Sequence, residues 1–189
     1  AKQSTTNIPL LWALGMKMDK FPEMAALGKE SFEDDFTRPS GDIFNHGLSY
    51  YRAYLKLRDY TETSNPSYVC LVFAIETFLK CLETKRVYTK QDTYTEGLAI
   101  YNFRENPRSH KHDLEELFRK LSKQTQDNIT SLYKNRFYGN FHEDLAAVSK
   151  GFIEWRYIYE GGVEVIYLSA LENIGECLFG YSESVFKNT

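Results

Sequence analysis

Two charged residues lie inside the most apolar stretch of the chain. Glu76 follows Ala74 and Ile75, and Lys80 comes four residues after Glu76. Side chains four residues apart are neighbours on a helix, and an acid that precedes a base in this order stabilises it. The pair is therefore either a surface ion pair or, because this helix has little polar surface, a carboxylate that faces a cleft or an internal cation.

A second polar group begins at His112. Asp113 is placed to cap a helix that starts at Leu114, and Glu116 lies three residues on, close to a capping box. His112 is either part of this structural cap or a residue that contacts a ligand. His110 and His112 face different directions on a helix because they are two residues apart, and Lys111 between them opposes a cation. We therefore predict no metal and no cofactor.

Arg156 lies between Trp155 and Tyr157, and Glu160 follows four residues later. An arginine among aromatic residues stacks on a ring, pairs with a carboxylate or holds a phosphate. The simplest structural interpretation pairs Arg156 with Glu76 or with Glu160.

These residues must be positioned by helices, because apolar residues recur at helical spacing through most of the chain. The clearest case is the segment 140–160, where Asn140 caps a stripe with steps of three and four residues. This stripe contains Phe141, Leu145, Val148, Phe152, Trp155 and Tyr159. The same reasoning predicts helices over 42–60, 66–82, 112–121, 124–137 and 163–179.

Two regions lack a continuous helical period. Residues 1–38 contain one amphipathic piece and are predicted to form an N-terminal helical arm or extension. Residues 87–109 mix Thr, Tyr, Asp, Gly and Pro, so they form either a long loop or a small hairpin between two core helices. We therefore predict an all-α fold, in which residues 39–189 form an antiparallel bundle of about five to seven helices with an irregular insert.

Composition excludes several classes of protein. The 189 residues carry 23 basic and 26 acidic side chains, and this net charge of −3 excludes a highly basic nucleic-acid wrapper. No stretch approaches the roughly 20 apolar residues of a membrane span. Three cysteines without a CxxC pair favour a reduced, cytoplasmic protein. Residues 80–136, with 12 basic against 8 acidic side chains, form either a solvated mixed surface or a patch that faces phosphates.

Four segments, taken in order, resemble the HEPN superfamily of helical domains from prokaryotic defence and toxin systems. They are Ala74–Lys80, His112–Leu117, Phe141 with Leu145, and Phe152–Glu160. The resemblance covers roughly residues 40–180. It implies an antiparallel helical bundle, commonly a homodimer with a cleft at the subunit interface.

In RNA-cleaving members of that superfamily, an arginine is followed about four to six residues later by a histidine, and the pair works without metal. No histidine follows Arg156 in this chain. Elsewhere in the chain Arg136 and His142 match this spacing, and they span the expected helix break at Gly139 and Asn140. The resemblance therefore implies a module without the intact catalytic motif.

The main hypothesis is a dimeric, HEPN-like module of a defence or toxin–antitoxin system that binds RNA, a nucleotide or a protein partner such as an antitoxin. One alternative is a metal-independent endoribonuclease that uses Arg136 and His142. A further alternative is a purely structural helical protein. The residues predicted to line the ligand cleft are Glu76, Lys80, His112, Asp113, Arg156, Tyr157 and Glu160.

Overall fold

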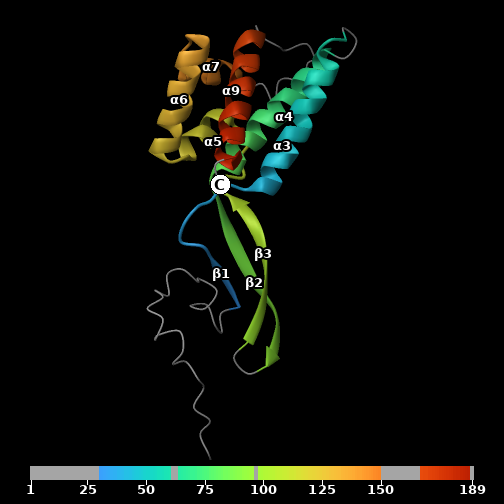
Figure 1. Cartoon of the computed structure of the whole chain (residues 1–189), viewed down its shortest axis with the longest axis vertical. Helices are drawn as coiled ribbons and strands as arrows, with labels where there is room; N and C mark the ends of the chain where they lie inside the picture. Colours follow the sequence, from blue (N-terminus) through green and yellow to red (C-terminus); the bar gives the residue numbers. More distant parts are fainter. Residues whose placement is uncertain (1–29, 61–63, 96–97, 150–166, 188–189) are drawn as a thin grey trace, which may run out of the picture. The chain divides into compact units, whose positions relative to one another are not determined.

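The computed structural model describes residues 30–60, 64–95, 98–149 and 167–187 (Figure 1). The chain divides into two compact units. One unit consists of residues 36–85 and 105–189 and carries the helices. The other consists of residues 1–35 and 86–104 and carries most of the sheet.

The described helices confirm the sequence periodicity. They are α3 (Gly41–Leu57), α4 (Ser64–Leu82), α5 (Leu114–Lys120), α6 (Lys123–Phe137), α7 (Phe141–Val148) and α9 (Leu168–Lys187). Of the predicted stripe over 140–160, Phe141, Leu145 and Val148 are buried, and its other members lie outside the described residues. None of the described helices has the length and apolarity that a membrane crossing requires.

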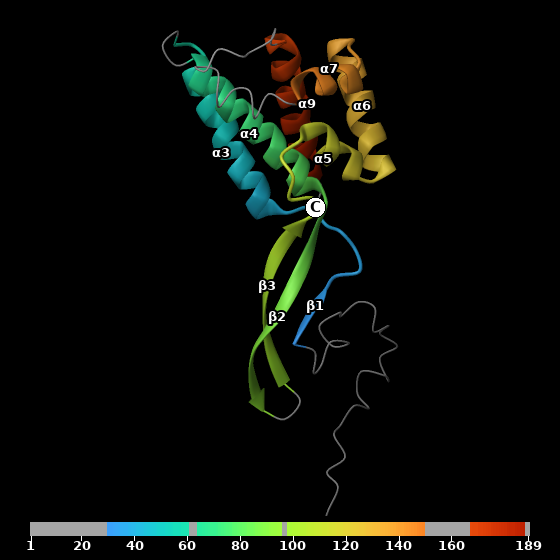
Figure 2. The ribbon, with the colours of Figure 1, turned by 180° about the vertical axis from the view of Figure 1, so that it is seen from behind.

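Helix α4 is the centre of the helical unit. It lies beside α3, with which it forms an antiparallel pair, and it also contacts α9 and α5 (Figures 1 and 2). The spacing of its apolar residues places several of them on more than one face, and each of these faces meets a neighbouring helix. Leu71, Ile75, Phe78 and Leu79 are all at most 2% exposed.

Two glycines allow the neighbouring helices to approach α4 closely. A Cβ atom at Gly175 of α9 would lie 2.5 Å from Leu71 Cδ1, and one at Gly47 of α3 would lie 2.9 Å from the Phe78 ring. Both distances are shorter than van der Waals contact, so a larger residue at either position would push the helices apart.

The predicted caps are confirmed. The Asp113 side chain accepts a hydrogen bond from the backbone N–H of Glu116 at 2.8 Å. The Asn140 side chain accepts one from the backbone N–H of His142 at 3.1 Å. Helix α6, which lies between α5 and α7 in the sequence, has its C-cap at Tyr138, a residue with a left-handed backbone and φ of 56°. Bulky residues rarely adopt this conformation, and no sequence pattern predicted it at this position.

The prediction of an all-α fold is wrong, because the segment predicted as an irregular insert forms two strands. These are β2 (Thr84–Thr95) and β3 (Leu98–Pro107). Together with β1 (Ser31–Glu33) they form a three-stranded sheet in the order β1-β2-β3. The segment is rich in Thr and Tyr, which favour strands, and it forms a hairpin instead of a loop.

Strand β1 (Ser31–Glu33) comes from the region predicted to be a helical arm, of which residues 1–29 lie outside the described residues. It pairs antiparallel with β2, with Phe32 opposite Tyr88. The Phe32 and Tyr88 rings stack at 4.6 Å, and the Arg86 guanidinium lies 4.4 Å from the centre of the Phe103 ring. Cross-strand aromatic pairs of this kind fix strand register.

A buried carboxylate joins the end of α4 to the start of α6. Glu83 is 7% exposed. Its Oε1 accepts hydrogen bonds from the Ser122 backbone N–H at 2.9 Å and from the Thr125 hydroxyl at 2.8 Å, and its Oε2 lies 3.0 Å from Arg108 Nε. Burial raises the pKa of Glu83, but the hydrogen bonds from Ser122 and Thr125 and the Arg108 charge outweigh it, so the pKa is lowered.

We expect Glu83→Gln to lower the free energy of unfolding by about 2 kcal/mol at neutral pH, because hydrogen bonds to a charged acceptor are lost. A lowered folded-state pKa stabilises the protein above the unfolded-state pKa of about 4.3, and this stabilisation is lost as pH falls through the folded-state pKa. Urea unfolding should therefore show a difference in unfolding free energy between wild type and Glu83→Gln, and this difference should become smaller as the pH is lowered into the acidic range.

The matched control is Glu183→Gln, which changes an exposed acid of α9 that pairs with Lys187. It should stay within about 0.5 kcal/mol of wild type at neutral pH. If wild type and Glu83→Gln differ in unfolding free energy by the same amount at neutral and acidic pH, the role assigned to this carboxylate is contradicted.

Candidate functional site

The structure brings together four of the residues predicted to line a cleft. Glu76 Oε1 accepts a hydrogen bond from Lys80 Nζ at 2.7 Å and lies 3.0 Å from His112 Nδ1. Asp113 follows His112 as the cap of α5. We call Glu76, Lys80 and His112 the α4–α5 cluster.

Local structure explains how the α4–α5 cluster forms. Glu76 and Lys80 lie one turn apart on α4, so their side chains meet without any tertiary contact. His112 arrives from a distant part of the sequence, and the Asp113 cap fixes the chain next to it. Glu76 and Lys80 have side chains that are 8% and 15% exposed, whereas His112 is 60% exposed. The cluster therefore has a buried acid and an exposed imidazole.

Asp113 and His112 have separate roles in this segment, and contact of His112 with a ligand stays a prediction. Asp113 is a cap, as its position predicted, and His112 contacts the buried carboxylate instead of standing apart from it. Glu76 Oε2 is buried and has no hydrogen-bond partner among the described residues. Pairing of Glu76 with Arg156 stays a prediction, because Arg156, Tyr157 and Glu160 lie outside the described residues.

A small depression, with a volume of about 10 Å³, lies next to Lys80 between α4 and α5. Its lining includes three cationic side chains, Lys80, Arg108 and Lys120, and one acid, Glu83. Arg108 also donates to the backbone carbonyl of Lys120 at 3.0 Å, which ties the end of β3 to α5. We call this surface the α4–α5 depression. Neither Arg108 nor Lys120 was identified from the sequence as a site residue, although both lie within the basic stretch 80–136.

Arg136 and His142 have different neighbours. The Arg136 guanidinium forms an ion pair with Glu176 of α9. The His142 ring instead meets the Phe118 ring of α5 edge-on at 5.5 Å. Arg136 and His142 therefore contact different residues, and their use as a catalytic pair stays a prediction.

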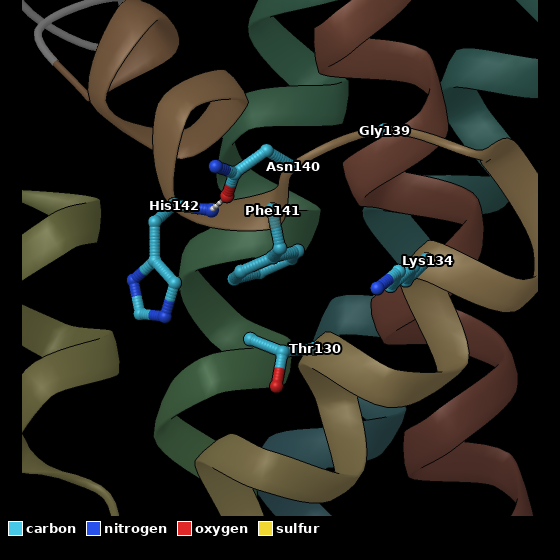
Figure 3. Close-up of a pocket in the computed structure, with 6 residues that line it drawn as sticks. All are labelled: Thr130, Lys134, Gly139, Asn140, Phe141 and His142. Atoms are coloured by element: carbon cyan, nitrogen blue, oxygen red, sulfur yellow. Dashed lines mark hydrogen bonds between the residues drawn. The ribbon is translucent and has the colours of Figure 1, made fainter.

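His142 lines a separate pocket at the junction of α6 and α7, which we call the α6–α7 pocket (Figure 3). Its volume is about 360 Å³. The described residues that line it are Thr130, Lys134, Gly139, Asn140, Phe141 and His142. Arg136, the cation that spacing suggested, is not among them.

The described residues contain no cluster of three His, Cys, Asp or Glu side chains placed to hold a metal ion. Comparisons with known proteins find no family model that matches this chain and no curated protein or solved structure that is similar to it.

We expect Glu76→Gln to lower the free energy of unfolding by about 2 kcal/mol, because Lys80 and His112 lose a charged acceptor inside the protein. Urea unfolding at neutral pH measures the effect. Glu115→Gln is the control, since Glu115 forms an exposed pair with Arg119 in the same part of the fold. That variant should change stability by less than about 0.5 kcal/mol. Equal stability of the two variants would show that the α4–α5 cluster does not hold α5 to α4.

Proposed function

We propose that this chain is a non-catalytic, HEPN-like helical module that binds RNA or a nucleotide through phosphate contacts at the α4–α5 depression. The observation that carries the proposal is the charge of this surface. Lys80, Arg108 and Lys120 line it; Lys80 pairs with Glu76 and Arg108 with Glu83, so Lys120 carries the excess positive charge, in a chain whose net charge is −3. A positive surface in an acidic protein favours a polyanionic ligand that binds at one place.

The arrangement of the α4–α5 cluster supports this proposal. The Glu76 carboxylate holds Lys80 at 2.7 Å, so the ammonium group has a fixed position where the depression begins. His112 beside it is exposed and supplies a ring nitrogen that donates to a phosphate oxygen when protonated. A cation that is already held in place loses less conformational entropy on binding.

Lys120→Glu tests the depression. We expect it to weaken binding of a fluorescently labelled single-stranded RNA by roughly tenfold at low salt, because a cation is replaced by an anion. It should also reduce the slope of log K against log salt by at least about 0.7, the value for one phosphate contact on a single strand. Fluorescence anisotropy over a salt series measures both quantities, and unlabelled mononucleotide as competitor separates the two ligand sources.

Lys56→Glu is the matched control. Like Lys120, Lys56 lies in the last turn of a helix, so both substitutions place an acid at a helix C-terminus at similar cost. Lys56 is exposed on α3 and does not line the depression. Equal weakening by the two variants, or no binding of RNA or nucleotide by wild type at low salt, would contradict the proposal.

The same RNA distinguishes binding from cleavage. A module without catalytic activity leaves the RNA intact in EDTA, and gel electrophoresis measures this directly. Cleavage by wild type that is abolished by His142→Ala would instead support the metal-independent endoribonuclease.

The proposed module forms a homodimer and works in the cytoplasm. An exposed aromatic residue supports self-association: Tyr50 of α3 is 40% exposed and stacks on the partly buried Phe73 of α4 at 5.1 Å. Exposed aromatic residues are enriched at protein interfaces. The three free cysteines, Cys70, Cys81 and Cys177, support a reducing compartment. Light scattering of the purified chain decides the oligomeric state.

A further inference from the structure

The lining of the α6–α7 pocket contains two basic residues that can donate hydrogen bonds. Lys134 of α6 and His142 of α7 stand on opposite sides of the Phe141 ring (Figure 3). No acidic side chain is among the described residues that line the pocket. Lysine supplies three N–H donors, and imidazole supplies one donor when neutral and two when protonated. The lining therefore suits an anionic ligand.

The nearest acids along the chain already accept hydrogen bonds. Glu143 accepts one from the Asn140 amide at 2.6 Å, and Asp144 accepts one from the Tyr133 hydroxyl at 2.6 Å. In the described part of the chain, Lys134 has no ion-pair partner. Its ammonium group is therefore not neutralised by either of these carboxylates, although both lie at the start of α7.

The position of His142 is fixed before any ligand arrives. Its backbone N–H donates to the Asn140 side chain at 3.1 Å, and its ring meets the Phe118 and Phe141 rings edge-on at 5.5 and 6.5 Å. Phe141 is only 2% exposed, so the floor of the pocket belongs to the protein core. A rigid floor and a capped helix keep the imidazole in place, which reduces the entropy cost of binding.

Gly139 is needed for the shape of this junction. A Cβ atom at Gly139 would lie 3.0 Å from Asp144 Oδ2 and 3.1 Å from the Tyr133 ring. Tyr138 directly before it has a left-handed backbone, with φ of 56°, and is 92% exposed. A bulky residue in this conformation costs roughly 1 kcal/mol, and such strain is found preferentially at functional sites.

The size of the pocket limits which ligands it can hold. The pocket volume of about 360 Å³ lies at the lower end of the range for small-molecule sites, which is about 300–1,000 Å³. A ligand the size of a mononucleotide or a sugar phosphate fits this range. A nucleic-acid strand would have to extend well beyond it.

We propose that the α6–α7 pocket binds the phosphate monoester of a small phosphorylated metabolite, with Lys134 Nζ and the His142 imidazole as donors to the phosphate oxygens. This site is separate from the α4–α5 depression and does not depend on RNA binding there. Arg136, which spacing had paired with His142, forms an ion pair with Glu176 of α9, and Lys134, two residues earlier, lines the pocket with the histidine.

Isothermal titration of the full chain tests the site with three probes: adenosine 5′-monophosphate, ribose 5-phosphate and adenosine. We expect both phosphate esters to bind and adenosine, which lacks the phosphate, not to bind. Lys134→Ala and His142→Asn should each weaken binding by about tenfold, because each removes a charge-assisted hydrogen bond. Tighter binding of adenosine 5′-monophosphate than of ribose 5-phosphate would identify a nucleotide as the source of the phosphate.

Lys123→Ala is the matched control, since Lys123 is an exposed lysine of α6 that pairs with Asp127 and does not line the pocket. It should bind the esters within about twofold of wild type. Thermal unfolding of each variant establishes that it is folded. The proposal is overturned if wild type binds neither ester at millimolar concentration, or if folded Lys134→Ala and His142→Asn bind as wild type does. Failure of RNA to bind at the α4–α5 depression would leave this result unaffected.

Discussion

The close packing of α4 against α3 and α9 is the constraint on which the helical unit depends. Leu71 and Phe78 fill the space that Gly175 and Gly47 leave open, so the three helix axes approach more closely than ordinary side chains permit. Because protein interiors are packed as tightly as organic crystals, a shift of α4 would displace every helix that contacts it. The position of α5 therefore follows from that of α4, whereas α6 packs on α9 and α7.

The polar residues near the end of α4 are a consequence of the same burial. Glu76 and Glu83 leave solvent with their helix, and a buried carboxylate is tolerated only when donors surround it. Those donors come from α4 itself, from the segments before α5 and α6, and from Arg108 after β3. One set of contacts thus holds the helices together and gathers cations at the surface, so stability and the proposed binding function share residues.

The two candidate sites use different physical means to favour anions. In the α4–α5 depression, buried acids hold cations in place, and the excess of positive charge at the surface is small. In the α6–α7 pocket, no described acid is part of the lining, and Lys134 and His142 supply the donors. A basic surface suits an extended phosphate backbone, whereas a pair of donors in one pocket suits one phosphate group.

The sequence by itself determined the features that depend on near neighbours. Helices α3 and α5 and the caps Asp113 and Asn140 follow from spacing within a few residues, and the Glu76–Lys80 pair follows from one helical turn. Only the tertiary structure decided that residues 87–109 form strands, because β2 is completed by β1 from more than fifty residues away. It also decided that Arg136 meets Glu176 while Lys134 lines the pocket of His142, since helix packing and not spacing selects which side chains meet across two helices.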